Sequence, residues 1–374
     1  MRLTTISIAT GFCLAWLCVS ACPDNDTELG ERIGQMIMVG FRGLTAPEDP
    51  ISSDIAEGSV GGVILFDYDV PSKSPVRNIE SPEQVRRLVG QLQLASHDPL
   101  LIAIDQEGGR ISRLKEKFGF PPTLSARRLG QLNDLEVTRE QARKTAQILR
   151  DLGMNLNFAP VVDLNTNPEN PVIGKLERSF SADPDVVTRH AIAWIEEHHK
   201  QGILCALKHF PGHGSSRADS HLGFVDVTET WDEAELKPYR EIIHAGLADA
   251  VMTAHIFNRK LDPDLPATLS HNVVTGLLRE RLGFDGVVFS DDLQMKAISD
   301  HYSPETAVEL CVQAGVDVLV FANNSVYDPD VGVKTAVMLE RLVREGKISR
   351  ERIEQSYRRI IKLKSRLKPQ AERP

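Results

Sequence analysis

Short apolar runs rich in valine, isoleucine and leucine recur along the chain, and a polar or glycine-rich loop follows each one. Several of the runs are nearly continuous, which is the pattern of strands buried on both faces of a parallel sheet. The spacers after most of them are long enough for a crossover helix. Eight strands are predicted, at GQMIMVGF from Gly34, GGVILF from Gly61, LLIAID from Leu100, NLNFAPVVDL from Asn155, ILCALKHF from Ile203, AVMTAHIF from Ala250, GVVFSDDL from Gly286 and VDVLVFAN from Val316.

Segments with helical spacing alternate with these runs. Examples are SPEQVRRLVGQLQLAS from Ser81 and VTRHAIAWIEEHHKQG from Val187, and the second ends in Lys, Gln and Gly as helices often do. Eight strand-and-helix units, of which the first are less regular, predict one (β/α)8 barrel of the TIM type, in the α/β class. A doubly wound open sheet is the alternative, but no G-x-G-x-x-G turn between a strand and a helix favours it.

The N-terminus carries a different pattern. Arg2 precedes an apolar run from about Ile6 to Val19, which is too short for a comfortable membrane span and suits the core of a signal peptide. The run ends in Val-Ser-Ala-Cys, which resembles a bacterial lipobox with Cys22 as the lipidated first residue of the mature protein. An ordinary secretory signal or a retained anchor is the alternative.

This pattern predicts three parts of the chain. Residues 1–21 are the signal peptide, 22–30 a short tether and 31–374 the barrel domain. We therefore expect an exported protein that is held at a membrane by a lipid anchor, in the periplasm or at the cell surface.

Composition narrows the class of partner. Apolar residues make up 41% of the chain and charged residues 25%, as in a soluble globular protein with a large core. The net charge is −9 and Lys and Arg are spread along the chain, so we expect no nucleic-acid partner. Cys205 and Cys311 lie in apolar runs and are predicted to be buried free thiols. We further expect a monomer without a cofactor.

Polar residues follow nearly every predicted strand. In a barrel of this type, catalytic groups come from the carboxyl ends of the strands and the loops after them. Their convergence on one face is hard to explain by folding alone. The strand-end residues are Asp105 to Arg113, Asp163, Arg178, Lys208, His209, His255, Asp291 and Asp292.

The stretch KHFPGHGSSRADSH, from Lys208 to His221, allows several kinds of chemistry. Its three histidines and Asp219 could bind zinc, but Pro211 and the two glycines around His213 prevent the helix on which a His-x-x-x-His pair shares a face. We therefore expect no metal. A serine nucleophile is also disfavoured, because no Gly-x-Ser-x-Gly turn is present to activate one.

Carboxylate chemistry fits these residues better. Asp291 follows a strand, where its side chain can project into the barrel mouth. Asp219 lies two residues before His221, near enough to fix the imidazole tautomer and raise its basicity. A proton-transfer pair opposite a nucleophilic carboxylate is the division of labour that glycoside hydrolysis requires.

Six motifs, in order along the chain, resemble glycoside hydrolase family 3, and within it the β-N-acetylhexosaminidases. The resemblance extends from about Gly34 to Leu363. The motifs are DQEGGRISR from Asp105, RSF from Arg178, KHFPGHG from Lys208, DSH from Asp219, MTAHI from Met252 and FSDDLQM from Phe289.

The resemblance implies a retaining exo-β-N-acetylglucosaminidase that acts on peptidoglycan-derived glycans through a glycosyl-aspartate intermediate. It assigns Asp291 as the nucleophile, and His221 paired with Asp219 as the general acid/base. His213 would serve the structure of the loop, and Glu107 is expected only to brace the turn that follows it. The implied sugar contacts are Asp105, Arg113, Arg178, Lys208 and His209.

One departure from the family pattern concerns substrate preference. Members usually have one residue between the glycine and arginine of VIGxRSF, whereas Lys175, Leu176 and Glu177 stand here. The insertion is a reason to expect Arg178 away from its usual place. Three alternatives stay open at this point: a β-N-acetylglucosaminide phosphorylase, a family 3 β-glycosidase with another sugar preference, and a non-catalytic sugar-binding lipoprotein.

Overall fold

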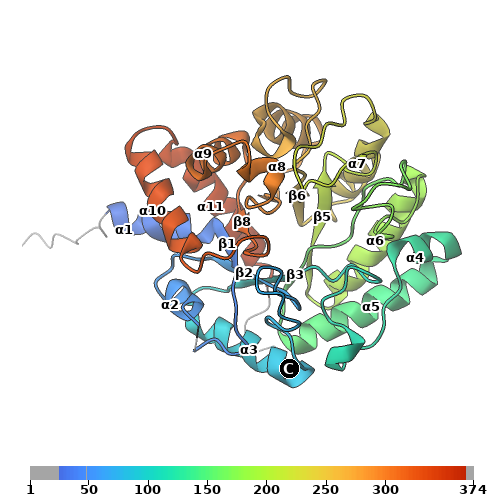
Figure 1. Cartoon of the computed structure of the whole chain (residues 1–374), viewed down its shortest axis with the longest axis horizontal. Coiled ribbons are helices and arrows are strands. Elements are labelled where there is room, and N and C mark those ends of the chain that lie inside the picture. Colours follow the sequence, from blue (N-terminus) through green and yellow to red (C-terminus); the bar gives the residue numbers. More distant parts are fainter. Residues whose placement is uncertain (1–24, 48, 368–374) are drawn as a thin grey trace, which may run out of the picture.

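A parallel barrel of eight strands, surrounded by helices, forms the molecule (Figure 1). The computed structural model describes residues 25–47 and 49–367. The strands are β1 (Ile37–Gly40), β2 (Gly62–Leu65), β3 (Leu101–Ile104), β4 (Leu156–Asn157), β5 (Leu204–Phe210), β6 (Ala250–Thr253), β7 (Val287–Phe289) and β8 (Leu319–Phe321). Each lies within one of the eight apolar runs, so the predicted strands are confirmed.

The strands follow chain order around the barrel. The hydrogen-bonded order is β7-β6-β5-β4-β3-β2-β1-β8, and every neighbouring pair is parallel. A parallel bridge between Phe289 and Val318 joins β7 to the start of β8, and the backbone N–H of Ser290 donates to Val318 at 2.9 Å. The predicted (β/α)8 barrel is therefore confirmed, and the carboxyl ends of all its strands meet at one mouth.

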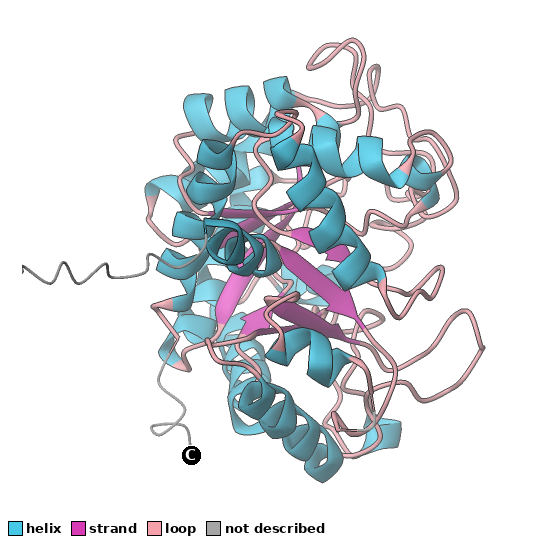
Figure 2. Cartoon of the chain, turned by 90° about the vertical axis from the view of Figure 1, so that its left-hand side faces the viewer, coloured by secondary structure: helices cyan, strands magenta, loops and turns pink. Residues whose placement is uncertain are grey.

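Helices enclose the strands, as the turned view shows (Figure 2). The α-helices are α1 (Asn25–Gln35), α2 (Ile51–Ala56), α3 (Pro82–Ala95), α4 (Ala126–Leu132), α5 (Leu135–Leu152), α6 (Pro184–Lys200), α7 (Lys237–His244), α8 (Lys296–Ser299), α9 (Pro304–Ala314), α10 (Val331–Arg344) and α11 (Arg350–Lys364). Short 3-10 helices are η1 (Glu116–Phe118), η2 (Glu233–Leu236) and η3 (Ala267–Leu269), and η4 (Asn272–Arg281) is π-helical.

Capping residues explain where the two predicted helices begin. Ser81 accepts a hydrogen bond from the backbone N–H of Gln84 at 3.2 Å, and Pro82 occupies the first turn of α3. Helix α6 begins at Pro184 rather than Val187, because Asp183 caps it in the same way. Both predicted helices are confirmed.

The core is continuous between the barrel and the helices. All strand residues are buried, and apolar faces of the helices pack over them. Cys205 on β5 and Cys311 on α9 are buried and free, as the sequence predicted. Burial of this extensive apolar surface is the main force that holds the barrel together.

The predicted signal peptide and the lipidation site at Cys22 lie outside the described residues. Residues 25–30, which the sequence assigned to the tether, form the first part of α1, and Leu29 is buried against the core. The predicted boundary between residues 30 and 31 therefore falls inside this helix. Within the ranges that the structure describes, no helix is both long and apolar enough to cross a bilayer.

A buried carboxylate joins three elements at the amino-terminal end of the barrel. Asp317, just before β8, is fully buried and accepts from the Arg279 guanidinium of η4 at 2.6 Å. It also accepts from the Ser356 hydroxyl of α11 at 2.8 Å and from the backbone N–H of Val288 at 3.0 Å. Asp317 thus links these elements far from the mouth, and the guanidinium groups of Arg352 and Arg359 also lie 3.3 Å from it.

We expect Asp317→Ala to lower the free energy of unfolding by about 3–5 kcal/mol, because it leaves the Arg279 guanidinium partly buried without its carboxylate. Urea denaturation followed by circular dichroism measures this. Asp285→Ala is the matched control. The Arg359 guanidinium lies 3.3 Å from Asp317 and 3.4 Å from Asp285, but the side chain of Asp285 is 75% exposed. This control variant should change stability by less than about 1 kcal/mol. Equal losses in the two variants would contradict the expectation.

Candidate active site

A cavity of about 290 Å³ opens at the mouth of the barrel. The residues around it come from the ends of most strands and the loops after them, as the topology requires. The structure brings all of the predicted catalytic and sugar-binding residues to this one cavity. These lining residues are Asp105, Arg113, Arg178, Lys208, His209, Asp219, His221 and Asp291.

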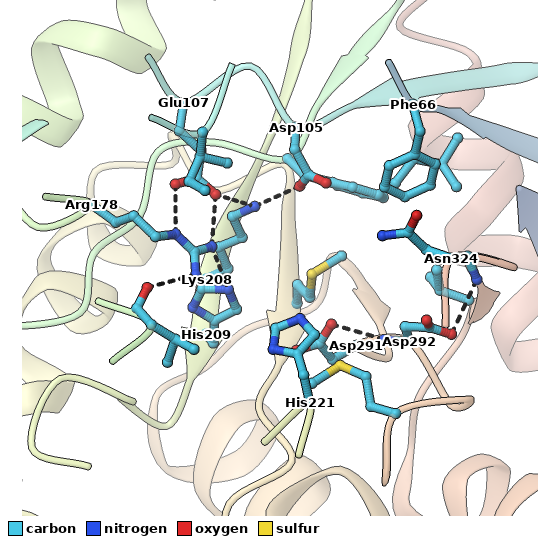
Figure 3. Close-up of a pocket in the computed structure, with 18 of the residues that line it drawn as sticks. Phe66, Asp105, Glu107, Arg178, Lys208, His209, His221, Asp291, Asp292 and Asn324 are labelled. Carbon is cyan, nitrogen blue, oxygen red and sulfur yellow. Dashed lines mark hydrogen bonds and ion pairs between the residues drawn. The ribbon is translucent and has the colours of Figure 1, made fainter. Parts of the chain in front are cut away.

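Charges of alternating sign form one wall of the cavity (Figure 3). The Lys208 side chain is 2% exposed, and its ammonium donates to Asp105 Oδ1 at 2.7 Å. It also lies 2.7 Å from Glu107 Oε1. Arg178 donates to both oxygens of Glu107, from Nε at 2.8 Å and from a terminal nitrogen at 2.7 Å. Each buried charge therefore has an opposite charge in contact, which is what makes its burial tolerable.

Arg113 extends this wall toward Phe66. A terminal nitrogen of Arg113 lies 3.3 Å from Asp105 Oδ2, and its guanidinium lies over the Phe66 ring at 5.2 Å from the centroid. Burial alone would raise the pKa of Asp105, but the charges of Lys208 and Arg113 outweigh it and hold that pKa far below its usual range. Asp105 is therefore a permanent hydrogen-bond acceptor.

Glu107 has a larger role in the site than bracing the turn that follows it. It lines the cavity and joins Lys208 to Arg178. Burial opposes its ionisation, but Arg178 and Lys208 prevail and lower its pKa. The spacing of Asp105 and Glu107 carried a signal, because residues two apart on an extended segment point to the same side.

The insertion before Arg178 is absorbed locally. Residues 174–177 form a turn in which the backbone N–H of Arg178 donates to Ile173 at 3.1 Å, and Glu177 takes a positive φ of 59°. The Ser125 hydroxyl donates a hydrogen bond to the Glu177 carboxylate at 2.9 Å. Arg178 therefore still reaches the cavity despite the insertion.

His209 lines the cavity, but both of its ring nitrogens already have hydrogen-bond partners from other side chains. Nδ1 lies 2.7 Å from Asp163 Oδ2, and Nε2 lies 3.0 Å from a terminal nitrogen of Arg178. A guanidinium only donates, so Nε2 accepts and Nδ1 carries the proton. Burial and the nearby charges of Arg178 and Lys208 hold the pKa of His209 well below its usual value. In this structure the neutral ring thus positions Arg178 and has no nitrogen free for a sugar.

Asp163 supports the segment that carries His209 and His213, a role that the sequence pattern does not predict. It is fully buried, and its Oδ1 accepts from the backbone N–H groups of His209 at 3.1 Å and His213 at 2.8 Å. The sequence shows that Asp163 follows a strand. Its hydrogen-bond partners, however, lie at the end of β5 and in the loop after it, which the local pattern does not reveal. Asp163, in the segment after β4, therefore fixes the start of the loop after β5.

Asp291 and Asp292 are neighbours with different environments. Oδ1 of Asp291 accepts from the backbone N–H of Asp292, at 2.8 Å. Burial would raise the pKa of Asp291, but the imidazoles of His255 and His221 outweigh it and lower that pKa. Asp291 is therefore an ionised carboxylate inside the cavity, the state that a nucleophile needs.

Asp292 instead joins two loops. Its Oδ1 accepts from the backbone N–H groups of Gln294 and Ala322, both at 3.1 Å, which links the loop after β7 to the end of β8. Burial raises its pKa to about 6. His255, noted at a strand end, also supports this loop, because its Nε2 lies 2.9 Å from the Asp292 carbonyl oxygen.

Asp219 and His221 form the predicted pair. His221 Nδ1 lies 2.7 Å from Asp219 Oδ1, which also accepts from the His221 backbone N–H at 2.8 Å. Burial opposes protonation of His221, but the hydrogen bond to Asp219 and the charge of Asp291 outweigh it and raise its pKa. Because Nδ1 faces Asp219, Nε2 is the nitrogen left for proton transfer.

The three histidines of the loop occupy separate places. His209 is tied to Asp163, His213 is buried behind the cavity, and His221 lines it. In the part of the chain that the structure describes, no group of three or more His, Cys, Asp or Glu side chains is arranged to hold a metal ion.

Residues 28–363 match the family model described as the glycosyl hydrolase family 3 N terminal domain. The chain belongs to glycosyl hydrolase family 3. The match spans all six motifs and all eight strands of the barrel.

Relatives of known name share most of this chain. A protein from Tolumonas auensis named beta-hexosaminidase is 40% identical over 71% of this chain and 76% of its own length. Beta-hexosaminidase A of Pseudoalteromonas piscicida is 34% identical over 90% of the chain, which spans only 61% of that relative.

Two solved structures have the same fold. A glycoside hydrolase family 3 beta-N-acetylglucosaminidase from Paenibacillus sp. superposes with a TM-score of 0.81 at 39% identity and covers 90% of this chain, which spans 62% of that protein. A beta-N-acetylhexosaminidase from Beutenbergia cavernae gives a TM-score of 0.81 at 30% identity, with 90% and 98% covered. Family 3 members of about this length therefore exist beside longer ones.

The pairing of Asp219 with His221 predicts a titration that NMR can follow. His221 should titrate above the ordinary histidine value, since its charged form gains a partner, and Asp219→Asn should lower its pKa because burial then acts with less opposition. The exposed Asp264→Asn is the control and should leave the titration of His221 unchanged. An unchanged pKa in Asp219→Asn would show that the pair does not set the basicity of His221.

Proposed function

We propose that this chain is a retaining exo-β-N-acetylglucosaminidase that cleaves terminal β-GlcNAc through a covalent glycosyl-aspartate. The observation that carries the proposal is one cavity that contains an ionised carboxylate, Asp291, and a carboxylate-paired imidazole, His221. Membership of family 3 and relatives named beta-hexosaminidase support the choice of reaction and sugar.

The charged wall provides the means to hold the sugar. The carboxylate of Asp105 can accept from sugar hydroxyls, and Lys208 and Arg178 can donate to them. Hydrogen bonds to fixed charges are strong and directional, which suits recognition of a terminal residue with several free hydroxyls. The contacts of Lys208 and Arg178 with Glu107 fix these donors before substrate arrives.

The first chemical step uses both sides of the cavity. A carboxylate oxygen of Asp291 attacks the anomeric carbon and forms a bond to it, while the bond from that carbon to the leaving oxygen breaks. Protonated His221 gives its Nε2 proton to the leaving oxygen, and Asp219 stabilises the imidazolium before the transfer. The aglycone departs as an alcohol.

The second step reverses the roles. Neutral His221 takes a proton from water, the hydroxide forms a bond to the anomeric carbon, and the bond to Asp291 breaks. Two inversions at that carbon give net retention of configuration. Asp291 and protonated His221 are restored, so the cycle needs only water.

The proposal extends to substrate source and location. We place the enzyme outside the cytoplasm as a monomeric lipoprotein anchored through Cys22, where peptidoglycan-derived glycans would be its substrates. The lipobox-like sequence at its N-terminus supports this placement. Release of the protein from membranes by detergent tests it, and a fully soluble product would reject the anchor.

The first test of function is turnover of p-nitrophenyl β-GlcNAc beside p-nitrophenyl β-glucoside, with the product anomer read by NMR. We expect the GlcNAc glycoside to be preferred with retention, and Asp291→Ala to lose activity by on the order of a thousandfold or more. The exposed Asp300→Ala is the control. A sugar-1-phosphate product in phosphate buffer would indicate a phosphorylase, and binding without turnover would indicate a lectin-like protein.

The acid role of His221 predicts a dependence on the leaving group. His221→Ala should slow hydrolysis of a GlcNAc disaccharide by about 10²- to 10⁴-fold, because its alkoxide needs a proton to leave. The p-nitrophenyl glycoside should be affected less, since p-nitrophenolate leaves without protonation. Steady-state kinetics on both substrates measures the two ratios. Equal losses would count against general acid catalysis.

A further inference from the structure

The loop after β5 has two parts, a buried one that neighbouring side chains hold and a more exposed one. Residues 211–216 are all buried, and side chains from the loop after β4 hold them. Asn170 Nδ2 donates to the carbonyl oxygens of His213 at 2.7 Å and Gly214 at 3.2 Å, and Asn167 Nδ2 donates to Ser216 at 2.7 Å. The first part of the loop is therefore fixed to the barrel.

Residues 217–224, which we name the dyad arm, carry the proposed acid/base pair. Seven of these eight residues are exposed or half-exposed, and only Ser220 is buried, at 2% exposure. The far end of the arm packs through Phe224 against the Phe257 ring, at 5.4 Å between centroids. The hydrogen bonds between Asp219 and His221 lie within the arm, so they move with it and cannot fix its position.

Ser220 joins the middle of the dyad arm to the rest of the molecule. Its Oγ lies 3.3 Å from His213 Nε2, and its carbonyl oxygen accepts from the backbone N–H of Ala297 in α8 at 3.2 Å. Ser220 stands directly between the two dyad residues and does not line the cavity. Its contacts therefore act on the position of the pair and not on the sugar.

His213 is a rigid partner for this contact. Asp163 accepts from its backbone N–H at 2.8 Å and Asn170 donates to its carbonyl oxygen, so the main chain is held on both sides. Its ring is buried at 2% exposure and meets the His209 ring edge to face at 6.1 Å. The ring thus connects the position of the dyad arm to the wall that holds the sugar.

We propose that Ser220 is a positioning residue, which sets the Asp219–His221 pair over Asp291 through its side-chain hydrogen bond to the buried His213. The inference rests on the proposed function and adds a residue to it. Proton transfer requires heavy atoms within about 3 Å, and a displacement of about 1 Å can cost on the order of a hundredfold in rate. Loss of the Ser220 hydroxyl should therefore impair proton transfer more than binding or folding.

The test compares Ser220→Ala with Ser215→Ala on a GlcNAc disaccharide and on p-nitrophenyl β-GlcNAc. Ser215 is buried in the same loop, and its hydroxyl has no hydrogen-bond partner among the described residues. In Ser220→Ala we expect kcat on the disaccharide to fall about tenfold or more, with KM within about twofold and a smaller fall on the aryl glycoside. Ser215→Ala should match the wild type on both.

A second pair of variants tests the partner. His213→Gln keeps a group that can bond to the Ser220 hydroxyl, whereas His213→Leu does not. We expect His213→Gln to retain more disaccharide activity than His213→Leu, and Ser220→Ala to add little to the loss in His213→Leu, because both remove one contact. Melting curves of each variant separate this effect from unfolding.

Three results would overturn the inference. Wild-type kinetics in Ser220→Ala would show that the contact is dispensable, and equal losses on both substrates with a lower melting temperature would show a purely structural role. Full additivity of Ser220→Ala and His213→Leu would show that they act separately. If the wild-type enzyme turns over neither substrate, the proposed function fails first, and this inference with it.

Discussion

The ammonium of Lys208 is the charge on which the mouth of the barrel depends. It is buried between Asp105 and Glu107, and Glu107 in turn holds Arg178. An isolated ion in such a place would be strongly destabilising, so each group is tolerated only because the others are present. The strands supply these side chains from β3, from β5 and from the loop after β4. The binding wall therefore exists only where these three segments meet.

The same cavity separates two adjacent carboxyl groups by their surroundings. Imidazoles around Asp291 favour its ionised form, whereas burial raises the pKa of Asp292 to about 6 while backbone N–H groups hold its Oδ1. Chemically identical side chains therefore take different tasks, one toward substrate and one toward the loops that present it. The difference comes from partners in the segments that follow β5, β6, β7 and β8, and not from the Asp-Asp sequence itself.

Sequence patterns predicted the eight strands, the barrel and eight of the residues that line the cavity, because buried parallel strands and strand-end polar residues leave local signals. Apart from the pairing of Asp219 with His221, they did not predict what those residues contact. Glu107 was expected only to brace a turn, and Asp163 and Asp317 have partners 46 and 38 residues away in Asp163–His209 and Asp317–Arg279. The insertion before Arg178 was absorbed by a left-handed residue, Glu177, which no spacing rule anticipates. Helix α1 likewise extends into the predicted tether, since Leu29 finds a place in the core.

The site has two regions that respond differently to pH. One is the binding wall around His209, whose ring stays neutral, and the other is His221. Asp105 and Glu107 ionise far below neutrality, Arg178 stays charged far above it, and His209 stays neutral, so the binding wall keeps one charge pattern across the physiological range. His221 alone among the cavity imidazoles has its pKa raised. Acidification of the surroundings would thus alter the supply of protons for the reaction while the surface that recognises the sugar remains the same.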